Sequence, residues 1–299
     1  MPVWYTALMA PEEPLPPPNT AGIVRPARRP PGWEAPGPRP RTPNRRDVWP
    51  GPNEDLCYLA GDFRILQRLD GHRLSVDDLV TAWYAAEAVA AAPPRRMVDL
   101  GCGIGTVLLF LAWRYPEARS TGIEAQAISA SMACRSVLWN GVDDRVEVRQ
   151  GDLRDEALTE GLGPADLVTG TPPYLPMGTG LLSPREQCAA CRFELRGGVE
   201  DYALAAARLL SPTAPFVGCS SARQRARVAA AAEGAGLVLE SFREVIGRHG
   251  KPSLFAVYAM RRPEAARVCS DEPPLVVRGE NGRFTEDFDE LRRSMGIPV

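Results

Sequence analysis

The sequence lacks the features of a membrane-spanning or secreted protein. No apolar run approaches the ~18 residues that a membrane-spanning helix needs, and the run Val107–Trp113 is too short. The first ten residues contain no basic segment ahead of an apolar one, so no secretory signal is expected. We therefore expect a cytoplasmic protein that does not partner with a membrane.

The sequence also has few residues suited to holding a metal. His72 and His249 are the only histidines, and the seven cysteines, an odd number, do not suggest a disulfide framework. Cys188 and Cys191 form one Cys-x-x-Cys pair, but zinc needs four ligands and no second pair follows. We predict no metal site, and interpret the pair as small apolar residues of a loop or helix.

The first 55 residues differ in composition from the rest. They hold half of the 30 prolines, and residues 21–50 carry seven arginines. Proline removes backbone donors, and few large apolar side chains offset the cost of ordering. We predict a disordered arm over residues 1–55, a globular domain over 56–262 and a C-terminal extension over 263–299. An RNA-binding arm and a solvated linker or leader both remain open.

The globular part alternates strands and helices. A capping box at Ser75 and Asp78 predicts the start of a helix, stopped by Pro93 and Pro94. Strands are predicted at 97–100, 120–124, 146–150, 165–170, 215–220, 237–246 and 253–260, and helices at 106–115, 125–140, 199–210 and 222–233. Such alternation indicates an α/β fold with a seven-stranded, mostly parallel sheet, to which the closing strand pair adds an antiparallel edge.

The first strand runs into the glycine loop Asp99-Leu-Gly-Cys-Gly-Ile-Gly105. In doubly wound sheets, ligands bind beyond the carboxyl ends of the strands. Gly101, Gly103 and Gly105 allow a sharp turn and a close approach of the backbone to a ligand. A dinucleotide fingerprint would place its third glycine at Thr106, so the spacing instead resembles the loop of Rossmann-like methyltransferases.

Acidic residues follow the next two strands. Glu124 ends the second strand, where a carboxylate can accept both ribose hydroxyls of an adenosine. Asp152, followed by Leu153, ends the third and is placed to accept from an adenine amino group. Each acid alone is equally well explained as a cap of a turn or helix. Together with the loop they predict an adenosine site.

The fourth strand leads into Thr171-Pro-Pro-Tyr174. This segment resembles the (Asn/Asp/Ser)-Pro-Pro-(Tyr/Phe) segment of amino-methyltransferases. From about Gly61 to Met295 the chain is similar to the tRNA adenine-N6 methyltransferases that modify A37 of valine tRNA. The similarity includes the segments Phe63-Arg-Ile, His72-Arg-Leu-Ser-Val-Asp77, Cys191-Arg-Phe-Glu194 and Gly279-Glu-Asn-Gly-Arg-Phe-Thr-Glu286.

The resemblance implies S-adenosyl-L-methionine as cofactor, a class I methyltransferase fold, and RNA, most simply tRNA, as partner. It adds Asp77 and Asp99 to the cofactor site and makes Thr171 to Tyr174 catalytic. An exocyclic amine is a poor nucleophile because its lone pair is delocalised. Thr171 Oγ1 and the Pro172 carbonyl, fixed by Pro173, would accept its two N–H groups, and Tyr174 would stack on a flipped base.

Threonine stands here where the family has asparagine, and its side chain is shorter and branched. This departure leaves the target atom open. Another RNA base amine, a protein glutamine amide, and a non-catalytic protein that binds cofactor and RNA are the alternatives. Arg192 and Glu194 are interpreted as an ion pair that supports the Pro-Pro-Tyr loop, or as surface charges.

Overall fold

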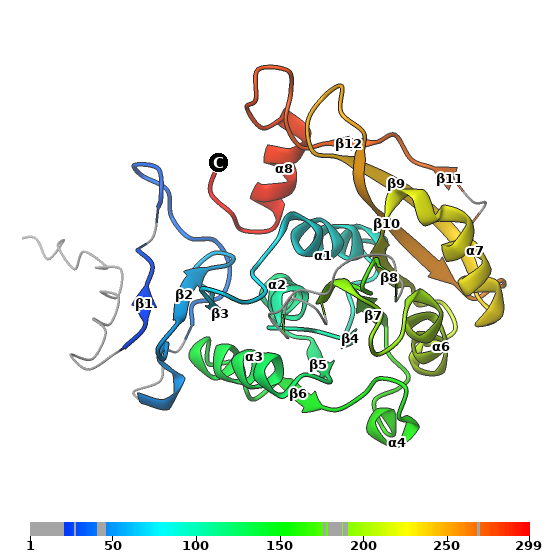
Figure 1. The fold of residues 1–299 in the computed structure, drawn as a ribbon, viewed down its shortest axis with the longest axis horizontal. Coiled ribbons are helices and arrows are strands. Elements are labelled where there is room, and N and C mark those ends of the chain that lie inside the picture. Colours follow the sequence, from blue (N-terminus) through cyan, green and yellow to red (C-terminus); the bar gives the residue numbers. More distant parts are fainter. Residues whose placement is uncertain are drawn as a thin grey trace, which may run out of the picture.

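The computed structural model describes residues 21–26, 28–40, 46–175, 178, 187, 191–267 and 270–299. Its centre is a sheet whose parallel part has the order β6-β5-β4-β7-β8 (Figure 1). Short apolar runs form these strands, and both of their faces are covered by helices. They are β4 Arg96–Leu100, β5 Arg119–Glu124, β6 Val146–Gln150, β7 Leu167–Gly170 and β8 Phe216–Ser220.

The other half of the sheet contains the long hairpin β9 Val238–Ile246 and β10 Ser253–Arg261. β10 pairs antiparallel with both β8 and β9. β10 is therefore the long antiparallel strand and lies inside the sheet, between β8 and β9. Two short strands, β11 Ser270–Asp271 and β12 Leu275–Val276, pair parallel with β9 and complete a nine-stranded sheet among the described residues. The predicted fold class is confirmed. The antiparallel strand is not at the edge, because β10 and not β9 hydrogen-bonds to β8.

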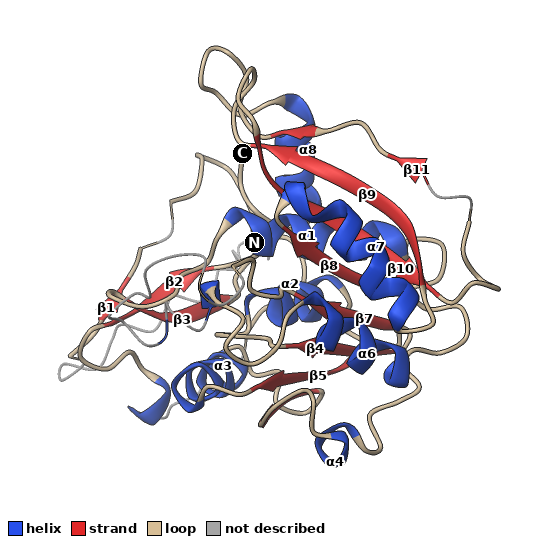
Figure 2. Ribbon diagram, turned by 45° about the vertical axis from the view of Figure 1, so that its right-hand side comes forward, coloured by secondary structure: helices blue, strands red, loops and turns tan. Residues whose placement is uncertain are grey.

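Helices pack on both faces of the sheet (Figure 2). One face carries α1 Val76–Ala88, α2 Thr106–Arg114 and α3 Ala127–Trp139, and the other carries α6 Val199–Leu209 and α7 Arg225–Gly234. Neighbouring residues of one strand divide between two cores: Leu167 belongs to the first and Val168 to the second, both fully buried. Two short helices follow strands of this sheet: α4 Glu156–Thr159 after β6 and η2 Ala222–Gln224 after β8.

A small three-stranded sheet packs beside α3, and it was not predicted. It contains β1 Ile23–Val24, β2 Glu54–Tyr58 and β3 Arg64–Arg68, with the short 3-10 helix η1 Arg46–Val48 before β2. Trp49 meets Trp139 of α3 edge-on with ring centroids 4.6 Å apart. The predicted disordered arm was therefore wrong for this part, since the boundary at residue 55 divides β2. A few apolar side chains suffice here because they share the core of the main domain.

Two of the arm's arginines have intramolecular partners. Arg25 pairs with Asp55 at 2.8 Å, and Arg29 pairs with Asp62 and lies over the ring of Tyr58. These two charges therefore support the fold of this region. Residues 1–20 lie outside the described residues.

The C-terminal extension packs onto the domain. Helix α8 Glu286–Ser294 contacts α1 and β12, and Met295, directly after the helix, is buried. The Gly61 amide then donates a hydrogen bond of 2.7 Å to the Gly296 carbonyl. Within the described ranges, no helix has the length and apolarity needed to cross a bilayer.

Candidate functional site

A cavity of about 1020 Å³ opens at the carboxyl ends of the parallel strands. Most of the residues that the sequence predicted line it: Asp77, Gly101, Gly103, Glu124, Asp152, Leu153, Thr171, Pro172, Pro173 and Tyr174. Asp99 and Gly105 are the predicted residues that do not. The fold thus brings segments separated by nearly a hundred residues into one site.

The glycine loop leaves β4 and turns into α2. Gly101, Gly103 and Gly105 have φ angles of +60°, +57° and +89°, a conformation that side chains other than glycine's rarely adopt. A Cβ at Gly101 would collide with the hydroxyl of Tyr202, whereas a Cβ at Gly103 would meet nothing within 4 Å. Gly103 therefore presents bare backbone to the open cavity, which suits the close approach of a ligand.

Glu124 ends β5 beside this loop. Its two carboxylate oxygens accept hydrogen bonds from the backbone amides of Gly103 (2.8 Å) and Gln126 (2.7 Å). Burial raises the pKa of Glu124, and these amides oppose the rise. Each oxygen retains a free lone pair, so a held carboxylate can still accept from ligand hydroxyls.

Asp99 lies on β4, shortly before the glycines of the loop, and does not line the cavity. Its Oδ1 accepts from the Thr169 hydroxyl of β7 at 2.8 Å, and Oδ2 has no hydrogen-bond partner among the described residues. Burial raises the pKa of Asp99 to about 7. The structure therefore places Asp99 in a position to link β4 to β7, and its prediction as a cofactor contact stays a prediction.

Asp152 faces the cavity but is paired within its own turn. Arg154 donates from Nε (2.9 Å) and Nη2 (2.6 Å) to the two oxygens of Asp152, and the Arg154 side chain lowers the pKa of Asp152. Leu153 between them is buried and lines the cavity. This edge of the site therefore combines an ionised carboxylate with an apolar surface.

At the other end of the cavity, Thr171 and Pro172 continue from β7. Neither the Thr171 hydroxyl nor the Pro172 carbonyl makes a hydrogen bond to another described residue. The loop after them is fixed, because Leu175 pairs with the strand-like segment 192–194 through bonds of 3.0 Å to Arg192 and Glu194. The Thr171 hydroxyl and the Pro172 carbonyl are therefore two free hydrogen-bond acceptors, and the backbone that follows them is fixed by hydrogen bonds.

Tyr174 is held through its hydroxyl. It donates to Asp77 Oδ2 at 3.0 Å and lies 3.0 Å from Cys219 Sγ, and burial raises its pKa. The other oxygen of Asp77 accepts from Ser75 Oγ. Asp77 thus positions Tyr174 as well as lining the cavity.

The predicted capping box of Ser75 and Asp78 is confirmed, directly beside Asp77. The Ser75 amide donates to Asp78 at 3.1 Å at the start of α1. Burial and the neighbouring Asp77 raise the pKa of Asp78 to about 8.

The predicted ion pair between Arg192 and Glu194 is wrong. Glu194 pairs with Arg227 of α7 at 2.6 Å, and Arg227 also pairs with Glu200 at 2.7 Å. Arg192 is exposed at the cavity instead. Cys188 lies outside the described residues, and within the described part of the chain no group of three or more histidine, cysteine or acidic side chains is placed to hold a metal.

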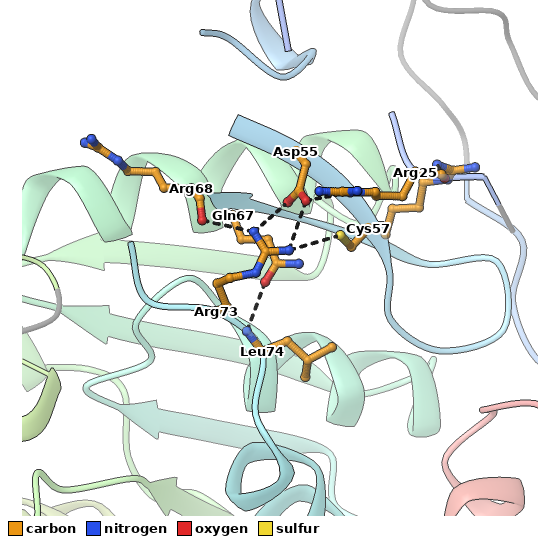
Figure 3. A network of polar contacts seen from close by, with 8 residues as sticks. Arg25, Asp55, Cys57, Gln67, Arg68, Arg73 and Leu74 are labelled. Atoms are coloured by element: carbon orange, nitrogen blue, oxygen red, sulfur yellow. Dashed lines mark hydrogen bonds and ion pairs between the residues drawn. The ribbon is translucent and has the colours of Figure 1, made fainter. Parts of the chain in front are cut away.

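A network that the sequence did not reveal holds the cavity lip at residues 71–75 (Figure 3). Asp55 of β2 is fully buried and accepts from Arg25 (2.8 Å) and Arg73 (2.9 Å), and the Arg73 guanidinium also donates to the Arg68 carbonyl. Beside it, Gln67 accepts from the Leu74 amide at 3.0 Å. No short sequence pattern indicates this network, because its members are brought together by the small sheet.

The comparisons with known proteins agree with this geometry. Residues 81–177 match the family described as Methyltransferase small domain. A tRNA1(Val) (adenine(37)-N6)-methyltransferase of Porphyromonas gingivalis is 32% identical over 142 residues, which is 47% of this chain and 55% of that protein. A release factor glutamine methyltransferase of Chlorobaculum tepidum is 31% identical over 93 residues, 31% of this chain and 32% of that protein. The chain thus spans about half the length, or less, of these curated relatives.

Among solved structures, a predicted O-methyltransferase from Agrobacterium tumefaciens superposes with a TM-score of 0.56 at 22% identity, covering 74% of this chain and 98% of that one. The chain has the class I methyltransferase fold, and residues 81–177 are similar to the Methyltransferase small domain.

Proposed function

We propose that the chain transfers a methyl group from S-adenosylmethionine to the exocyclic N6 amine of an adenine in tRNA. One observation carries the proposal: a single cavity has a buried carboxylate and bare glycine backbone at one end and two free acceptors on a proline-fixed loop at the other. The similarity to the tRNA methyltransferase of Porphyromonas gingivalis supports it.

The residues at the first end suit S-adenosylmethionine. Gly103 offers space without a side chain, Glu124 offers two held acceptors for ribose hydroxyls, and Leu153 with Asp152 offers an apolar surface beside an acceptor for an adenine amine. When bound there, the sulfonium supplies an already activated methyl group. Transfer would break the bond between sulfur and methyl carbon, release S-adenosylhomocysteine, and leave the methylated nitrogen to lose one proton to water. The protein therefore needs to orient the acceptor nitrogen and need not provide a strong base.

The second end positions the nucleophile. Thr171 Oγ1 and the Pro172 carbonyl accept the two N–H groups of the amine, which draws the nitrogen toward tetrahedral geometry and directs its lone pair at the methyl group. The Tyr174 ring, fixed by Asp77, stacks on a base swung out of its strand. Because these acceptors are organised before the reaction, they stabilise the transition state without reorganisation.

Thr171→Val tests this role, because it keeps the shape of the side chain and removes the acceptor. We expect methyl transfer to tRNA to fall by about 10²-fold or more, with S-adenosylmethionine affinity unchanged in calorimetry. Thr171→Ser, which keeps a hydroxyl, is the matched control and should retain activity. Thr171→Asn should keep or raise activity on an adenine-containing RNA.

Two results would contradict the proposal in different ways. A fully active valine variant would leave the Pro172 carbonyl alone to orient the nucleophile. An asparagine variant that loses activity on the native substrate would make the threonine an adaptation to another target. The glutamine amide of a protein, the substrate named for the Chlorobaculum tepidum relative, is then the next candidate.

A further inference from the structure

Three arginines with exposed side chains surround the mouth of the cavity: Arg192, Arg196 and Arg223. No side chain of the three makes a hydrogen bond or an ion pair with another described residue. Arg154, Arg225 and Arg227, by contrast, each pair with a carboxylate nearby. The three mouth arginines therefore present charge that this fold does not neutralise within its described part.

The acidic residues of the cavity lie further inside. Glu124 and Asp78 are buried, and Asp77 and Asp152 are half-buried and hydrogen-bonded. The site is therefore acidic within and basic at its opening. This arrangement complements a ligand that carries hydroxyl and amine groups into the site and keeps its anionic groups outside.

The three arginines are distributed around the opening. Arg192 belongs to the segment that pairs with Leu175. It lies near His72, whose pKa is lowered by burial, with a smaller contribution from the Arg192 charge. Arg196 lies near Glu124 and Asp152, since its charge acts on the pKa of both. Arg223 belongs to η2, directly after β8. The positive charge thus covers both the cofactor end and the acceptor end.

Exposed apolar side chains accompany these charges. Leu175 and Leu254 line the cavity with 39% and 63% of their surface exposed, and Leu195 of the 191–197 segment is 41% exposed. Unpaired bases stack on apolar surfaces and on guanidinium planes, while the phosphates between them need positive charge. A surface that combines exposed leucines with arginines meets both needs, whereas an acidic peptide would need only the charges.

We propose that Arg192, Arg196 and Arg223 bind the phosphates of the single-stranded RNA segment that flanks the base in the cavity. This inference rests on the proposed function and adds the part of the substrate that lies outside the catalytic pocket. In this proposal the three arginines contribute to RNA affinity, and the loop at Thr171 determines which base is methylated.

The test compares two double variants that remove the same charge. Arg192→Ala/Arg223→Ala removes two mouth arginines and leaves Arg196, which lies near the cofactor end. Arg95→Ala/Arg119→Ala removes two exposed arginines near the amino ends of β4 and β5, at the opposite edge of the sheet. Binding of bulk tRNA is measured by fluorescence anisotropy over a range of salt concentrations, with S-adenosylmethionine affinity measured by calorimetry.

For the mouth variant we expect roughly tenfold weaker tRNA binding. The slope of log K against log salt should be shallower by about 0.7 for each phosphate of a single strand that the protein no longer neutralises. The control variant should keep the wild-type slope, and both should bind the cofactor as wild type does.

Equal slopes in the mouth variant and the wild type, with tRNA still methylated, would overturn the inference and leave the proposed function standing. A wild-type protein that binds no tRNA and methylates a protein instead would overturn both.

Discussion

Glu124 shows how one side chain meets both a structural and a functional demand. Its oxygens fix the glycine loop through Gly103 and the start of α3 through Gln126, yet they face the cavity. Ligand hydroxyls bind best to the ionised form. Since burial raises the pKa of Glu124 above its ordinary value of 4.5, protonation begins at a higher pH than for an exposed glutamate.

We therefore predict that S-adenosylmethionine affinity falls as the pH is lowered toward and through the raised pKa of Glu124. Glu124→Gln should weaken binding by about 1–3 kcal/mol at neutral pH, because an amide group replaces one charged acceptor. It should also remove this part of the pH dependence. The Glu124 charge also contributes to the raised pKa of Asp99, so the difference between the two calorimetric pH profiles reports the loss of the Glu124 carboxylate together with its effect on Asp99.

Glu147→Gln is the matched control, because Glu147 lies on the adjacent strand β6 with an exposed side chain and does not line the cavity. It should bind S-adenosylmethionine as the wild type does at every pH. Wild-type affinity in Glu124→Gln would mean that the ribose binds elsewhere.

At the scale of elements, the small sheet is tied to the cavity lip through Asp55. Burial raises the pKa of this carboxyl, but the hydrogen bonds from Arg73 and Arg25 outweigh burial and lower it below 3.8. A lowered pKa contributes stability that is present above the unfolded value and lost as the pH falls through the folded value. Solvent reduces the contribution of these ion pairs to the stability, because both arginines are partly exposed.

We predict that Asp55→Asn lowers the free energy of unfolding by about 1–3 kcal/mol at neutral pH, since it leaves two guanidinium groups without their buried partner. The difference from wild type should shrink as the pH falls below 3.8. Urea denaturation at several pH values measures both effects.

Asp70→Asn breaks the exposed Arg68–Asp70 pair in the same region and should change stability far less. If the two asparagine variants were equally stable at neutral pH, the Asp55 network would not tie the small sheet to the domain.

At the scale of the molecule, local patterns were enough to predict the layered fold and to pick out many of the residues that line the cavity. Strand β6 was predicted to the residue, and the glycine loop and the Thr171 segment lie at the same cavity because parallel strands end at one edge. What sequence reasoning missed depends on long-range packing and pairing. Trp49 belongs by sequence to a proline-rich stretch but packs on Trp139, and Glu194 finds its partner on α7, not beside it in sequence.

The most direct test of the account is the fate of a labelled methyl group. The purified chain is incubated with S-adenosylmethionine carrying a labelled methyl group and with bulk tRNA, ribosomal RNA and cell protein in parallel, and the labelled tRNA is digested to nucleosides. The account predicts label in tRNA, recovered as N6-methyladenosine. Label recovered on a protein glutamine, or on no RNA at all, would contradict it.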